Sequence, residues 1–167
     1  LRRFLRQGGA EQVQSAAPQR MPVRQVDHAL RRAGREIIAA IWRDSSLLTE
    51  ILSLIPMEDF PDEFIAQLLQ TMAAHLDAGG ILDADFIAAQ PTATGDELTR
   101  AIVEEGRTEA SYREALGMLR RACLAHALAR HTRRAEEMMQ EGKEGYIDEL
   151  NEVKRIQDEI ARENLHE

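Results

Sequence analysis

The sequence has little of what disulfide-bonded proteins, membrane proteins and many metal sites require. Its single cysteine, Cys123, excludes an internal disulfide and a cysteine-based zinc site within this chain. No apolar run approaches the roughly 18 residues of a membrane span, and the opening residues Leu1 to Phe4 are not followed by the apolar stretch of a signal peptide. We therefore expect a cytoplasmic protein without a membrane partner. Because residue 1 is not Met, we also expect the chain to be part of a longer protein.

Recognisable catalytic motifs are missing as well. The chain has no glycine-rich phosphate loop, no G-x-S-x-G, no H-E-x-x-H and no EF-hand loop. His126 and His131 are five residues apart, which places them roughly 140° apart around a helix and off a shared metal-binding face. Cys123 is interpreted as a small buried hydrophobe. We expect a non-catalytic chain without cofactor or metal, with one alternative: a small helical enzyme that uses carboxylate pairs such as Asp83 and Asp85 with a divalent cation.

Charge is distributed unevenly along the chain. The net charge of −8 divides into +6 over residues 1–35 and −14 over the rest, and residues 136–167 alone carry −7. A strongly acidic body repels nucleic acid, so we expect no direct nucleic-acid contact by that body. Residues 1–25, with two adjacent glycines and two prolines, are interpreted as a flexible basic linker or the tail of a preceding domain.

Apolar residues recur at helical spacing along the remainder, and no segment alternates as a strand would. Pro61 is placed in the first turn of one helix, and residues 91–95 are interpreted as a turn. The expected helices cover residues 30–42, 47–55, 60–76, 83–89, 96–105, 108–140 and 146–163.

The helix expected over residues 108–140 is unusually long. At 1.5 Å per residue, about 30 residues extend roughly 45 Å, which exceeds the diameter of a compact bundle of this size. Its end should therefore project. The predicted fold is all-α: a helical bundle of about six helices in residues 26–134, joined by the long helix to a C-terminal helical hairpin in residues 135–167. A two-helix hairpin has little core of its own, and apolar residues left over at its end would form a partner site. The open alternative is a hairpin that folds back on its own bundle.

Five arginines gather on the long helix near the expected junction of bundle and hairpin. They could pair with the acidic body of this chain or meet an acidic partner, and the sequence leaves both possibilities open. They are Arg120, Arg121, Arg130, Arg133 and Arg134.

Over residues 34–163, the chain resembles the C-terminal helicase-binding domain of bacterial DNA primase. The first helix, Arg35 to Asp44, is similar to the family's opening helix, with a charged pair, an apolar stretch and a polar break. The step Phe60-Pro61-Asp62-Glu63 leads into a helix, as in the family. The best match is a long helix with Arg120-Arg121, a turn containing Gly142, and a closing helix with Leu150, Val153 and Ile156.

The resemblance implies a two-part helical fold that holds primase on the hexameric replicative helicase for primer synthesis and stimulates the helicase. In the family, the hairpin supplies most of the binding and the bundle most of the stimulation, and the catalytic and zinc-binding parts lie in other domains. The linker would then follow the polymerase domain.

On this interpretation the chain is a non-catalytic, monomeric interaction domain whose hairpin contacts the helicase. Apolar side chains would supply desolvation and acids would steer the encounter. An alternative is the N-terminal domain of a replicative helicase, or a helicase-loader-like module, with the same fold. The expected contact residues are Met138, Met139, Tyr146, Ile147, Glu149, Leu150 and Val153.

Overall fold

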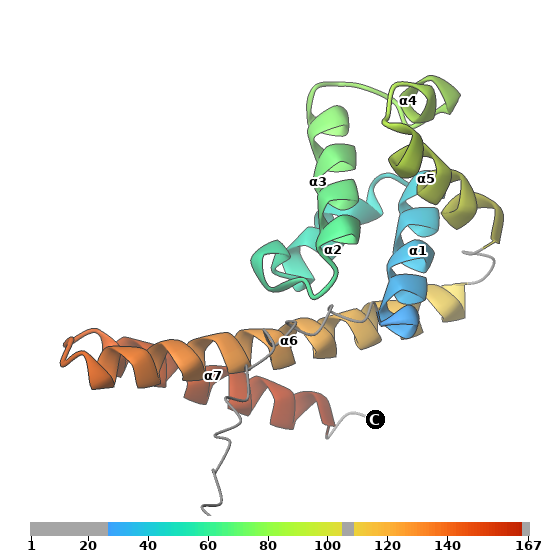
Figure 1. The fold of residues 1–167 in the computed structure, drawn as a ribbon. Coiled ribbons are helices and arrows are strands. Elements are labelled where there is room, and N and C mark those ends of the chain that lie inside the picture. The colour runs from blue at the N-terminus through green and yellow to red at the C-terminus, as the bar shows by residue number, and fades with distance from the viewer. Residues whose placement is uncertain (1–26, 105–108, 165–167) are drawn as a thin grey trace, which may run out of the picture.

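The computed structural model describes residues 27–104 and 109–164, and the predicted linker of residues 1–25 lies outside them. The described residues form seven α helices and one short 3₁₀ turn, without a β strand. The all-α prediction is therefore confirmed. Figure 1 shows a bundle of shorter helices above one long helix, with the last helix lying along the part of the long helix that projects from the bundle.

Helix α1 (His28–Arg43) is the central element of the bundle and packs against α5 and α6. Asp27 caps its start, because the Asp27 carboxylate accepts hydrogen bonds from two backbone N–H groups of the first turn. Its apolar face, which includes Ile37, Ile38 and Ile41, is fully buried. The Arg35 guanidinium on the same helix donates to Glu97 of α5 at 2.6 Å, so an ion pair reinforces the apolar packing.

Helix α2 (Leu47–Leu54) stops before Pro56, and the 3₁₀ turn η1 (Met57–Asp59) leads to α3 (Glu63–Asp77). The predicted position of Pro61 in the first turn of this helix is wrong. Asp62 is the N-cap and its carboxylate accepts the N–H groups of Phe64 and Ile65, so Pro61 lies before the helix. An aspartate side chain can satisfy these donors, whereas a proline cannot.

Helix α4 (Ala84–Ala88) is followed by α5 (Thr92–Glu104). The turn predicted over residues 91–95 is wrong, because α5 already begins at Thr92. The Gly95 N–H donates to the Pro91 carbonyl at 2.9 Å, so Pro91 precedes the first helical residue, where its missing N–H costs nothing. Gly95 is buried against the Ile87 carbonyl, and this close packing explains a glycine inside a helix.

Helix α6 (Glu109–Gln140) runs beneath the bundle and continues past it, and α7 (Tyr146–Asn164) returns along its projecting half (Figure 1). The apolar residues of α6 pack with different partners along its length. Residues up to Cys123 belong to the bundle core, while Leu124 and Ala127 pack with Ile156 of α7 in a separate small core. The hairpin packing thus reaches further back along α6 than the expected division between residues 134 and 135.

Candidate protein-interaction site

Two glycines shape the turn that closes the hairpin. Helix α6 ends at Gln140, and Gly142 adopts the left-handed conformation (φ 67°) that side chains disfavour. The Lys143 N–H then donates to the Met138 carbonyl at 2.9 Å. Gly145 leaves room for the same methionine, because a Cβ at Gly145 would lie 2.6 Å from Met138 Cε. After this turn, α7 runs antiparallel to α6 and packs against it.

Three of the predicted contact residues are exposed apolar side chains near this turn. Met139 is 55% exposed, Ile147 is 55% exposed and Leu150 is 44% exposed. Ile147 and Leu150 are three residues apart on α7, so they lie on one face of the helix. Exposed apolar side chains that gather at one end of a projecting element are typical of a partner site.

The other apolar residues predicted as contacts are half-buried. Met138 lies against Gly145, as described above, and Tyr146 and Val153 are partly covered. The predicted apolar contact residues at the end of the hairpin are therefore of two kinds, partly covered and exposed.

Glu149, which we expected to steer a partner, is engaged inside the hairpin. Its carboxylate lies 2.5 Å from His131 Nδ1 and 3.0 Å from Arg134 Nε, both on α6. The hydrogen bond from His131 holds the pKa of Glu149 below its usual range, and the Arg134 charge acts in the same direction. Glu149 therefore joins α7 to α6, and its predicted steering role is replaced by a structural one.

Other acids are better placed for steering. Glu136, Glu144 and Asp148 are exposed, and the described structure gives none of them a cationic partner. Glu141 is paired with Lys143 at 2.5 Å. The end of the hairpin thus combines exposed apolar groups with uncompensated negative charge, and this charge would raise the rate of encounter with a basic surface.

A buried ion pair ties the bundle to α6 where the hairpin begins. Asp59 in η1 is only 3% exposed, and its carboxylate accepts two hydrogen bonds from Arg130, at 2.7 and 2.9 Å. Arg130 also lies 3.2 Å from His131, which holds Glu149. His126 Nδ1 lies 3.7 Å from Asp59. A continuous chain of polar contacts therefore connects the bundle, the long helix and α7.

Four of the five clustered arginines lie close to acids of this chain. Arg120 pairs with two acids of α7, Glu159 at 3.0 Å and Glu163 at 2.5 Å. Arg130 and Arg134 have the partners described above, and Arg133 lies 3.7 Å from Glu137. The structure therefore favours pairing within this chain over a surface for an acidic partner.

The described residues offer no constellation for metal or thiol chemistry. They contain no group of three or more His, Cys, Asp or Glu side chains that could hold a metal ion. Cys123 is fully buried as predicted, and burial raises the pKa of its thiol to about 12, with Asp59 adding to the effect. Among the same residues, no helix has the length and apolar character needed to cross a bilayer.

Comparison with known proteins finds no family model, no curated protein and no solved structure that matches this chain.

Proposed function

We propose that this chain is the C-terminal helicase-binding domain of a bacterial DNA primase and that it docks on the hexameric replicative helicase through the end of its hairpin. The observation that carries the proposal is the exposure of Met139, Ile147 and Leu150 at the closed end of a hairpin that projects from the bundle. A domain that only needed to fold would gain by covering these side chains.

The chemistry of this end fits a binding role. The apolar side chains would supply the desolvation energy of docking, which interfaces draw mainly from a few central residues. The unpaired acids Glu136, Glu144 and Asp148 would attract a basic rim on the helicase. The helicase surface that fits is therefore an apolar depression bordered by Lys or Arg.

The proposed mechanism is recruitment. A polymerase domain linked to this chain would be held at the replication fork at a high effective concentration, and the linker would set the distance that it can reach. The bundle would contribute the stimulation of the helicase. The domain itself would perform no chemistry.

The proposal is tested by measuring the affinity of the chain for the hexameric bacterial replicative helicase, with Ile147→Asp as the main variant. Ile147 is 55% exposed, so an aspartate there leaves the fold intact and places a charge in the apolar contact. We expect the affinity to fall at least about tenfold. The matched control is Ile81→Asp, the same change at a 74% exposed isoleucine between α3 and α4 in the bundle.

Three outcomes separate the possibilities. Loss of binding in Ile147→Asp alone supports docking through the hairpin. Equal binding of the wild type and of a chain truncated after Arg134 would contradict it. If the wild-type chain does not bind the helicase at all, the proposed function is wrong.

A further inference from the structure

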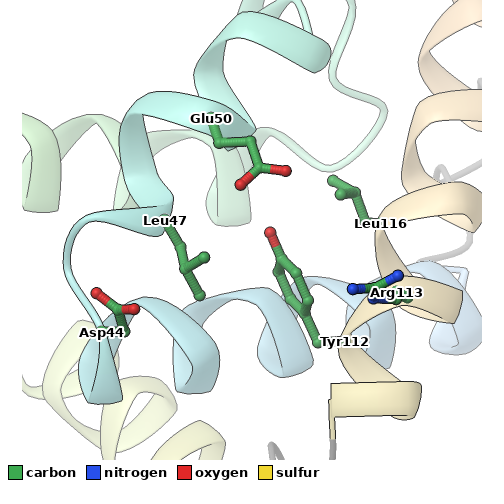
Figure 2. A pocket seen from close by; sticks show the side chains of 6 residues that line it. All are labelled: Asp44, Leu47, Glu50, Tyr112, Arg113 and Leu116. Carbon is green, nitrogen blue, oxygen red and sulfur yellow. The ribbon is translucent and has the colours of Figure 1, made fainter.

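A pocket lies on the bundle, away from the end of the hairpin. Its volume is about 490 Å³, and it lies where the α1–α2 corner faces the beginning of α6 (Figure 2). A pocket of several hundred Å³ into which a few polar groups point is typical of a ligand-binding site. Its lining residues are Asp44, Leu47, Glu50, Tyr112, Arg113 and Leu116.

Tyr112 supplies a polar group that the rest of the described structure does not satisfy. Its side chain is nine-tenths buried, with 8% of the residue exposed, and its hydroxyl has no hydrogen-bond partner among the described residues. Figure 2 shows the ring crossing the pocket from α6, with the hydroxyl directed toward the space between Glu50 and Leu116. A buried hydroxyl without a partner is costly, so a group that pairs with it would be bound favourably.

Two of the lining residues are acidic, Asp44 at the C-cap of α1 and Glu50 in α2, and one, Arg113, is basic. The sequence contains no Lys or Arg between residues 44 and 99, but eleven Asp and Glu residues in the same stretch. Asp44 accepts hydrogen bonds from the Ser46 hydroxyl at 2.6 Å and the Ser46 N–H at 3.0 Å, and these bonds lower the pKa of Asp44. Asp44 therefore stays ionised at neutral pH. Glu50 is exposed, and Figure 2 shows its carboxylate above the Tyr112 hydroxyl.

The Tyr112 hydroxyl is also protonated at neutral pH. Burial raises its pKa, and the Glu50 charge raises it further. The hydroxyl oxygen can therefore accept a hydrogen bond from a donor that lies between it and the Glu50 carboxylate. Leu47 and Leu116 also line the pocket and add apolar surface beside these polar groups.

We propose that this pocket binds an arginine side chain of a partner protein. The guanidinium would lie between the Glu50 carboxylate and the Tyr112 hydroxyl, and its alkyl stem would lie against Leu47 and Leu116. Arginine fits better than lysine, because its planar head presents five donors that can reach a carboxylate and a hydroxyl together.

Tyr112 can report the binding directly. The chain has two tyrosines, so Tyr146→Phe leaves Tyr112 as the sole tyrosine. In this protein with a ¹³C-labelled tyrosine ring, we would titrate the blocked tripeptide acetyl-Ala-Arg-Ala-amide at neutral pH and follow the ring resonances. We expect a saturable shift with a Kd of about 1–10 mM, as befits a single side chain. The same tripeptide with citrulline, which replaces the guanidinium by a neutral urea, should bind at least about tenfold more weakly.

A second pair of variants locates the charge. Glu50→Gln should weaken binding of the arginine tripeptide about tenfold, because it removes the anionic acceptor. The control is Glu136→Gln, an exposed glutamate near the end of the hairpin, and it should bind like the parent protein. Both positions are exposed, and circular dichroism checks that both variants remain helical.

Two results would overturn the assignment. No ring shift with the arginine tripeptide, or an equal shift with the citrulline tripeptide, excludes a guanidinium site. None of these measurements involves the helicase, so they leave the proposed function untouched.

Discussion

The bundle and the hairpin are held together in different ways. Among the residues that the structure describes, the bundle encloses a core of 21 buried ones drawn from α1 to α6, including Ile38, Ile51 and Leu69. In the described part of the hairpin, the core consists of the buried Leu124, Ala127 and Ile156, with the partly buried Leu128 and Ile160 packed against them. Along the rest of the hairpin, ion pairs join α7 to α6. One part of the chain therefore depends on apolar burial, and the other on a few apolar contacts supplemented by charge.

This difference explains why the hairpin suits a binding role. Exposed ion pairs contribute little stability each, so the hairpin is expected to be the less stable unit. Its sparse core also leaves Met139, Ile147 and Leu150 uncovered. The bundle also exposes Ile81 and Val103, but its large core does not depend on a partner, whereas a hairpin with so small a core can gain stability from one.

The largest effect is expected from a cavity in the bundle core. Ile38 in α1 is fully buried, and Ile38→Ala should lower the free energy of unfolding of the bundle by about 3 kcal/mol through lost burial and an unfilled cavity. The fluorescence of Trp42, the only tryptophan, measures this in urea. An unchanged urea midpoint would show that the bundle does not depend on its core in the way described.

A matched change in the hairpin should have a smaller and local effect. Ile156 is 1% exposed, and Ile156→Ala should cost about 2 kcal/mol, because a cavity in a thin core can partly collapse. The ¹³C-labelled ring of Tyr146, at the start of α7, reports unfolding of the hairpin in urea. We expect its midpoint to fall while the Trp42 midpoint stays. If both midpoints fall together, the two parts unfold as one unit and the contrast between them is lost.

Helical spacing in the sequence was enough to predict where the helices lie. The apolar positions of α1, α3 and α7 recur on one face, and Gly142 lies at the end of α6 as expected. The errors occurred at helix starts, where Pro61 and residues 91–95 were misplaced. Proline favours both the first turn and the residues just before it, and only the capping hydrogen bonds of Asp62 decide between these positions.

The candidate sites were less predictable, because their contacts join distant parts of the chain. Ile147 and Leu150 follow from helical spacing and a shortage of partners in a two-helix hairpin. The pairing of Asp59 with Arg130 joins residues 71 positions apart, and no local pattern indicates it. Tyr112 is buried on the side of α6 that faces the bundle core. Its unpartnered hydroxyl depends on the position of α2, which the sequence pattern does not contain.

The smallest expected effect concerns the charge that joins α7 to α6. The pKa of Glu149 is lowered in the folded protein, chiefly by the hydrogen bond from His131, so the folded state favours ionised Glu149. Its contribution is therefore present above the ordinary glutamate pKa and is lost as the pH falls through the lowered value. Over this acidic range, the urea midpoint reported by the Tyr146 ring should decrease. The decrease should be equivalent to less than about 1 kcal/mol in the free energy of unfolding of the hairpin. In Glu149→Gln this part of the decrease should be absent, and the Trp42 midpoint should respond equally in both proteins. An identical acid response of the Tyr146 midpoint in wild type and variant would mean that Glu149 does not join the two helices energetically, and that the hairpin depends on Ile156 and its neighbours alone.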